Sequence, residues 1–454
     1  MNCFNEIISR AADQTFKKKK SNNQTKRKCK HKKWFDKDCI HLKKDLLYSA
    51  RLVNKYPFDV RLRELYFVKK KKYKKIIKIK QENERNLVVN KLTNLKNTNP
   101  KQFWNLINEL KNSNTSTSTC IPISPEKWDE YYKTLNMTDK NNDFHNSIGS
   151  KILNMQNRKE SNHMMNSQIT EKEIILAIKK LKNKKSPGYD GYCSELLKCS
   201  SDFLIKPLQK LFNLILESGI YPEMWNISII THIFKKGTRD DPDNYRGISV
   251  SSCVGKTFCS IINNRISQYI ETNNILNNNQ AGFRKGYRTT DQIFVLKTIV
   301  KKYLSLNRKL YACFVDFKKA FDSVWRNGLF FKLLDYGING RIYDIIRNMY
   351  ENTKSCIRFK NKISNIFETK KGVRQGCIIS PILFNLFIND ITKSLEDVSQ
   401  DQITINNNKI NSLLYADDLV IMSKTNNGLQ NYLNNYKTTV KNGKFKLIYP
   451  RPKL

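Results

Sequence analysis

The chain has 454 residues, and its 82 Lys and Arg side chains against 40 Asp and Glu give a formal net charge of +42. This length suffices for two or three domains, and the basic excess favours a polyanionic partner. No apolar run approaches the ~20 residues of a transmembrane helix, and no signal-peptide pattern is visible, so we expect no membrane partner. The 11 Cys contain no Cys-x-x-Cys pair, which argues against a disulfide framework or a zinc site.

The N-terminal third of the chain is predicted to precede the main domain. Residues 1–35 form a basic tail with charge runs such as Lys17–Lys20, for which we predict disorder. The tail suits either a nuclear-import signal or a solvated terminus. Residues 36–111 are predicted as a basic helical connector, since Leu and Tyr recur there at helical spacing. Residues 112–168 are polar and are predicted as a linker and loop region.

The connector contains a dense lysine run between positions 69 and 80. A helix here would present lysines on most faces, which suits contact with a phosphate backbone. A solvated connector helix is the alternative. The lysines that we predict to contact nucleic acid are Lys69, Lys70, Lys71, Lys72, Lys74 and Lys75.

Regular structure is predicted to resume at Thr170, where Glu173 lies three residues further on and completes a capping-box pattern. Helical and strand patterns then intermix towards the C-terminus. We therefore predict an α+β domain over residues 169–454, with its core at about residues 215–440.

Three acidic residues stand at the ends of apolar runs. Asp316 closes the run at 311–315, while Asp417 and Asp418 interrupt two strand-like runs, as the tip of a hairpin would. Carboxylates are the hard oxygen ligands that Mg²⁺ prefers, and two such ions a few ångströms apart catalyse phosphoryl transfer. In so basic a chain, this acid cluster predicts metal-dependent phosphoryl transfer on a nucleic acid.

Several further blocks occur together with these acids, and in this order the chain resembles the reverse transcriptases of non-LTR (LINE-type) retrotransposons. The strong resemblance covers roughly residues 170–425. The blocks are Lys185-Ser186-Pro187-Gly188-Tyr189-Asp190-Gly191, Ile233-Phe234-Lys235-Lys236-Gly237, Asn244-Tyr245-Arg246-Gly247-Ile248-Ser249, Gln280-Ala281-Gly282-Phe283-Arg284, Val315-Asp316 through Ala320-Phe321-Asp322, Gly372-Val373-Arg374-Gln375-Gly376-Cys377 through Ser380-Pro381, and Tyr415-Ala416-Asp417-Asp418.

The resemblance implies the palm and fingers of a right-hand polymerase, preceded by the basic helical connector. It implies an RNA template, a DNA primer, deoxynucleoside triphosphates and two Mg²⁺ ions, with Mn²⁺ as the alternative metal. Asp316, Asp417 and Asp418 match the family's catalytic metal ligands, and the carbonyl of Phe317 is expected to touch one metal. The compartment that follows is the nucleus, the cytoplasm or both. The oligomeric state is left open.

The same resemblance suggests a nucleotide site. Lys235 or Lys236, together with Arg246, is expected to bind the triphosphate. Phe321 matches the aromatic residue that excludes a 2′-hydroxyl, although an ordinary core Phe is the alternative. Gln375 and Gly376 are expected beside the nascent base pair, and Arg284 is expected to contact nucleic acid.

The resemblance weakens at both ends of the chain. No endonuclease-like set precedes the connector, and Pro450 and Pro452 interrupt the segment where the family continues towards a thumb. We therefore expect a truncated or frame-shifted copy that lacks the endonuclease and the thumb. The alternatives to an active polymerase are an inactive nucleic-acid-binding remnant and a group II intron-type maturase, which would need a further domain after the palm.

Overall fold

The computed structural model separates the chain into two compact units, Met1–Cys120 and Ile121–Leu454. Most of the predicted basic tail, residues 114–122, 137–142 and 157–163 of the predicted linker region, and the proline-containing C-terminus lie outside the described residues. The structure describes Glu6, Arg10 and residues 34–113, 123–136, 143–156, 164–359, 362–396, 401–405 and 408–442.

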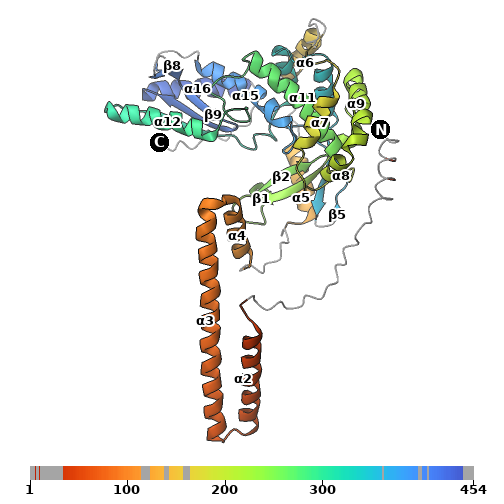
Figure 1. Cartoon of the computed structure of the whole chain (residues 1–454). Coiled ribbons are helices and arrows are strands. Elements are labelled where there is room, and N and C mark those ends of the chain that lie inside the picture. The colour runs from red at the N-terminus through yellow and green to blue at the C-terminus, as the bar shows by residue number, and fades with distance from the viewer. Residues whose placement is uncertain are drawn as a thin grey trace. The chain divides into compact units, whose positions relative to one another are not determined.

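The first unit contains a hairpin of two helices that run side by side, followed by a shorter third helix (Figure 1). These are α2 (Lys37–Lys55), α3 (Val60–Thr98) and α4 (Pro100–Ser113). Asp36 caps α2 by accepting a 3.1 Å hydrogen bond from the Cys39 backbone N–H, and it also pairs with Lys80 of α3. The hydrogen bond from Lys80 lowers the pKa of Asp36 to about 2. This contact joins the start of α2 to the middle of α3.

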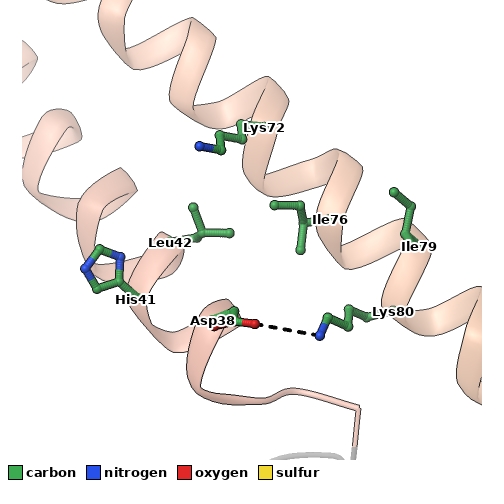
Figure 2. Close-up of a pocket in the computed structure, with 7 residues that line it drawn as sticks. All are labelled: Asp38, His41, Leu42, Lys72, Ile76, Ile79 and Lys80. Atoms are coloured by element: carbon green, nitrogen blue, oxygen red, sulfur yellow. Dashed lines mark ion pairs between the residues drawn. The ribbon is translucent and has the colours of Figure 1, made fainter.

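Between α2 and α3 lies a groove of about 480 Å³, which Figure 2 shows with its lining side chains. Leu42 of α2 and Ile76 of α3 face each other across it, and Lys72 lies beside them. At one end, the Lys80 amine lies 3.8 Å from the Asp38 carboxylate. No side chain of α3 is fully buried, so this long helix is stabilised mainly along the one face that meets α2.

The second unit is a mixed α+β domain. Its helices are α5 (Pro125–Asn136), α6 (Asp143–Gln156), α7 (Glu171–Lys180), α8 (Ser194–Cys199), α9 (Ser201–Ser218), α10 (Glu223–Asn226), the 3₁₀ turn η1 (Pro242–Asn244), α11 (Cys253–Thr272), α12 (Thr289–Ser305), α13 (Arg326–Asp335), α14 (Arg341–Glu351), α15 (Ser380–Glu396) and α16 (Asn426–Asn442). Its strands are β1 (Ile227–Phe234), β2 (Tyr245–Val250), β3 (Tyr311–Asp316), β4 (Lys354–Phe359), β5 (Lys362–Ile363), β6 (Phe367–Glu368), β7 (Ile403–Ile405), β8 (Asn408–Ile410), β9 (Ser412–Tyr415) and β10 (Asp418–Ser423).

The strands of this unit form separate sheets. One sheet has the order β2-β1-β4-β5, with β6 also paired to β4, and its β1–β4 pair is parallel. A second, antiparallel sheet has the order β3-β10-β9, and β7 pairs with β8. Ile299 and Tyr303 of α12 pack on the β3-β10-β9 sheet around Met422. None of the described helices has the length and apolar character needed to cross a membrane.

The predicted capping box before α7 is present. Thr170 accepts from the Glu173 backbone N–H, and the Glu173 carboxylate accepts from the Thr170 N–H at 2.9 Å. Arg265 of α11 donates to the same carboxylate at 2.8 Å. The cap therefore also fixes α7 against α11.

The prediction of a linker and loop over residues 112–168 is wrong for two segments, which form α5 and α6. Trp128 of α5 is 1% exposed and packs with Ile230 and Ile357 of the first sheet. Its ring stacks on the buried His232 at a centroid distance of 3.6 Å. The apolar side chains of α5 are few but lie on one face, so tertiary burial stabilises a helix that composition alone does not reveal.

We predict that Trp128→Ala destabilises the second unit by about 3–5 kcal/mol, because a large buried ring is replaced by a cavity. Urea unfolding followed by circular dichroism measures this loss. Phe203→Ala is the control, since Phe203 is 84% exposed and its removal should change the free energy of unfolding by less than about 0.5 kcal/mol. Equal effects of the two variants would contradict the burial of α5 in the core of the second unit.

Candidate active site

The pairing of β3 with β10 brings the predicted acids together. The two strands are antiparallel, and Asp316 at the end of β3 lies opposite Asp418 at the start of β10. Asp417 occupies the turn between β9 and β10, directly after Ala416, whose φ of 59° is left-handed. The hairpin thus presents Asp417 and Asp418 next to Asp316, as the sequence predicted.

A buried glutamine holds this hairpin turn. The Gln280 side-chain oxygen accepts from the Ala416 N–H at 3.0 Å, and its amide donates to the Ala416 carbonyl at 3.2 Å. The same oxygen accepts from the Gly282 N–H at 2.8 Å. A Cβ atom on Gly282 would collide with the backbone of Ala416, so the Gln280-Ala281-Gly282 block acts as a platform for the acidic turn.

The carboxylates of the acid cluster repel one another. Burial raises the pKa of Asp418, and the negative charges of Asp417 and Asp316 raise it further, while Lys235 opposes them. Among the residues that the structure describes, no group of three His, Cys, Asp or Glu side chains is arranged to hold a metal ion. Carboxylates that repel one another favour a bound cation, and their hard oxygens are the donors that a divalent cation prefers. The donor chemistry therefore fits Mg²⁺ or Mn²⁺.

A cavity of about 670 Å³ lies beside the acids. Asp316 and Asp417 line it, whereas Asp418 is exposed beside it and does not. The predicted site residues that line the cavity are Lys235, Arg246, Asp316, Phe317, Phe321, Gln375, Gly376 and Asp417.

Of the two lysines predicted for phosphate contact, the structure favours Lys235. It follows the last residue of β1, where its N–H donates to the Asn244 carbonyl at 2.8 Å. Arg246 lies on β2 opposite Ile233 of β1. Lys236 is exposed and does not line the cavity. The β1–β2 hairpin and the residue that follows β1 therefore carry Arg246 and Lys235, the two basic side chains that we consider for triphosphate binding.

The turn at residues 372–376 is joined to two other walls of the cavity. The Val373 N–H donates to the Phe321 carbonyl at 2.8 Å, and the Ser249 N–H of β2 donates to the Gln375 carbonyl at 2.7 Å. Gly376 has a φ of 113°, and a Cβ atom there would lie 2.6 Å from the Ser249 carbonyl. This backbone is open only to glycine.

Two buried arginines lie behind this turn. Arg326 donates to the carbonyls of Gly372, at 3.0 Å, and of Tyr350. Arg374 donates to the side-chain oxygen of Asn226 at 2.7 Å and to the Met349 carbonyl at 3.3 Å. Burial lowers the pKa of Arg326 to about 10. These guanidinium groups connect the turn to the Asn226 side chain of α10 and to backbone oxygens of α14.

Phe321 is held in a fixed orientation. Its ring stacks on Phe384 of α15 at a centroid distance of 4.9 Å and an interplanar angle of 12°. Phe283 meets it edge-on at 6.0 Å. Because Phe321 also lines the cavity, its ring packs in the core and at the same time forms part of the cavity wall.

Asp322 is a cavity residue that the sequence did not reveal. Its carboxylate accepts a 3.2 Å hydrogen bond from the Gln375 side-chain amide. Burial raises its pKa to about 6, against an ordinary value of 3.8. Its position directly after Phe321 was the only available signal, and sequence cannot show that a carboxylate is desolvated.

The prediction that Arg284 contacts nucleic acid does not fit the structure. Its side chain is 5% exposed and pairs with Glu271 at 2.7 Å. It also donates to the carbonyls of Asn277 and Gln280 at 3.1 and 3.2 Å. Since its donors are used within the protein, we assign Arg284 to holding the loop that carries Gln280.

The lysines of α3 are at the surface. Lys71, Lys72, Lys74 and Lys75 are exposed, and Lys69 and Lys70 are half-exposed. The Lys70 amine lies 5.3 Å from the centre of the Tyr66 ring. Apart from Lys72 beside the groove of Figure 2, these side chains remain available to a polyanion.

We predict that Asp322→Asn stabilises the protein at neutral pH. A carboxylate whose folded pKa is raised contributes stability that is complete at about pH 4 and is lost as the pH rises through about 6. The free energy of unfolding of Asp322→Asn minus that of the wild type should therefore be larger at about pH 8 than at about pH 4, by up to about 3 kcal/mol. Urea unfolding at both pH values measures the gain. An equal difference at both values would contradict the raised pKa.

A scan against protein families matches residues 233–448 to the family "Reverse transcriptase (RNA-dependent DNA polymerase)". The matched segment begins at the end of β1 and contains every residue of the predicted metal and nucleotide sites. It excludes α5, although Trp128, Tyr131 and Tyr132 of this helix line the cavity.

Curated relatives come from insect mobile elements. The chain is 30% identical over 272 residues to a probable RNA-directed DNA polymerase from transposon BS of Drosophila melanogaster, covering 58% of this chain and 29% of that protein. It is 27% identical over 278 residues to the RNA-directed DNA polymerase from mobile element jockey of Drosophila funebris, covering 59% and 30%. It is 28% identical over 264 residues to the Pol polyprotein of the retrotransposable element R2DM of Drosophila melanogaster, covering 58% and 24%.

The chain thus spans less than a third of the length of these relatives. The matched region nevertheless contains the β3–β10 acid pair, the Phe321 wall and the turn at 372–376. The family match and the names of these relatives both indicate an RNA-directed DNA polymerase. Residues 233–448 therefore match the reverse transcriptase family, and the chain is similar to the RNA-directed DNA polymerases of non-LTR retrotransposons.

Proposed function

We propose that the chain extends a DNA primer on an RNA template, using deoxynucleoside triphosphates and two divalent cations. The observation that carries this proposal is the common cavity, which is lined by Asp316, Asp417, Lys235, Arg246 and Phe321. Carboxylates and basic side chains in one cavity suit a substrate that carries a triphosphate and reacts at its α-phosphate.

In this proposal, Asp316 and Asp417 hold the cations from the cavity wall, Asp418 contributes from beside it, and the carbonyl of Phe317 adds an oxygen. When bound, the cations activate the primer 3′-hydroxyl and stabilise the charge on the leaving pyrophosphate. Lys235 and Arg246 bind the triphosphate and orient it by charge-assisted hydrogen bonds. Gln375 and Gly376 contact the nascent base pair.

The exposed lysines of α3 would bind template or primer phosphates independently of base sequence. Such contacts release counterions, so the affinity for RNA should fall steeply with salt concentration. We keep a second candidate function, a remnant that binds nucleic acid without polymerising it, because these lysines lie in the first unit and do not depend on the acid cluster.

We predict that the full chain extends a DNA primer on an RNA template with Mg²⁺, and that Asp417→Asn lowers the rate at least about 100-fold, because a ligand of the cations is lost. Gel-resolved primer extension measures the rate. Asp335→Asn is the matched control, since Asp335 is exposed at the end of α13. A folded wild type that binds RNA in a salt-sensitive way without extending the primer would favour the remnant instead.

We predict that Phe321→Val increases ribonucleotide incorporation relative to deoxynucleotide incorporation about 10-fold or more, because removal of the ring leaves room for a 2′-hydroxyl. Single-nucleotide incorporation with the two substrates measures the ratio. Phe314→Val is a control, since Phe314 is 60% exposed on β3 and does not line the cavity. An unchanged ratio in Phe321→Val would remove this role from Phe321.

A further inference from the structure

The cavity that we assign to the nucleotide contains a carboxylate with no evident part in metal or phosphate binding. Asp322 lies six residues after Asp316 and lines the cavity beside Gln375. We propose that Asp322 is a positioning residue: it fixes the rotation of the Gln375 side-chain amide, so that the amide oxygen faces the nucleotide. This inference rests on the proposed function, because it deepens the role of Gln375 in that site.

The contact between these residues is set by the backbone. The Gln375 amide nitrogen lies 3.2 Å from the Asp322 carboxylate. The turn that bears Gln375 is joined to the segment of Asp322 on both sides, since Val373 donates to the Phe321 carbonyl at 2.8 Å and Gly372 donates to the Val324 carbonyl at 2.9 Å. The two side chains therefore meet because their main chains are held together.

The charges around Asp322 leave this hydrogen bond as its main polar interaction. The positive charge of Lys319 opposes the effect of burial on Asp322, but the Lys319 amine lies 2.7 Å from the Asp243 carboxylate and 4.6 Å from the centre of the Tyr131 ring. Tyr132 of α5 lines the same cavity, and its pKa is raised by burial and further by the negative charge of Asp322. Within the described part of the chain, Asp322 forms no ion pair.

The chemistry of the two groups determines the orientation. An ionised carboxylate can only accept hydrogen bonds, whereas a carboxamide has one donating and one accepting end. Asp322 therefore selects the NH₂ end of Gln375 and leaves the oxygen for the cavity. An oxygen in this place recognises a donor on the substrate, such as a hydroxyl or a base amino group. With a neutral amide at position 322, both orientations of Gln375 become possible.

The environment of Asp322 also favours a functional role. Burial raises its pKa to about 6, so the ionised form weakens the fold at neutral pH, and an asparagine of the same shape would not. A charge that costs stability in a site is a common feature of residues that serve binding or catalysis.

The first test is a double-mutant cycle in steady-state primer extension by the full chain. Asp322→Asn should raise the KM for deoxynucleotides about 5-fold and leave kcat within about 2-fold, as expected for one hydrogen bond lost from binding. In the Gln375→Ala background, Asp322→Asn should change KM by less than about 2-fold, because its effect passes through Gln375. Asp335→Asn is the matched control and should leave KM unchanged.

Additive effects in this cycle would overturn the proposal, since Asp322 would then act without Gln375. A fall in kcat with KM unchanged would overturn it too, because positioning of a binding group should appear in KM. Both results would leave the proposed polymerase function intact, since wild-type extension is the reference in every comparison.

The second test does not require activity. In protein labelled with ¹⁵N-glutamine, the side-chain amide resonances of Gln375 are assigned by their loss in Gln375→Ala. They should shift with pH with a midpoint near 6 in the wild type, and this titration should be absent in Asp322→Asn. Of the other groups that face Asp322, Lys319 and Tyr132 titrate well above this range. The proposal would be overturned if the Gln375 resonances titrated in the same way in Asp322→Asn as in the wild type. A clear titration in a protein that does not extend primers would count against the proposed function alone.

Discussion

The antiparallel pairing of β3 with β10 is the interaction on which the rest of the site depends. It places Asp316 opposite Asp418, an arrangement of like charges that is unfavourable by itself. The opposite face of the same strands buries Val315, Leu419 and Ile421, and this apolar burial offsets the repulsion. Gln280 and Gly282 then hold the turn that bears Asp417. The acids are thus close because the apolar core beneath β3 and β10 and the platform at Gln280–Gly282 hold the hairpin in this position.

A second constraint acts on the opposite wall of the cavity. The conformation of the turn at 372–376 depends on backbone hydrogen bonds with Phe321 and Ser249, in which Val373 donates to Phe321 and Ser249 donates to Gln375. Arg326 also donates to the Gly372 carbonyl. Buried guanidinium groups that donate to several carbonyls make such a turn rigid. Rigidity here matters for the chemistry that we propose, because Gln375 and Asp322 can select a donor on the substrate only if their main chains stay in register.

Helix α5 shows that the domain begins before the segment that matches the family. The family match starts at residue 233, yet Trp128 and Tyr132 of α5 close one side of the cavity and pack on β1 and β4. A segment of low apolar content can therefore belong to the core when its few large rings share one face. The cavity is completed by residues about a hundred positions before the motifs that define it.

The sequence by itself determined the acids, the α+β class of the domain, the capping box at Thr170 and the blocks that line the cavity. These features depend on local backbone demands and on the chemical type of a side chain, both of which are written in short motifs. Only the tertiary structure decided that Lys235 rather than Lys236 lines the cavity. It also decided that Arg284 forms an ion pair with Glu271 and that Asp322 accepts a hydrogen bond from Gln375. Partner identity and desolvation arise from contacts between distant segments, and no local pattern encodes them.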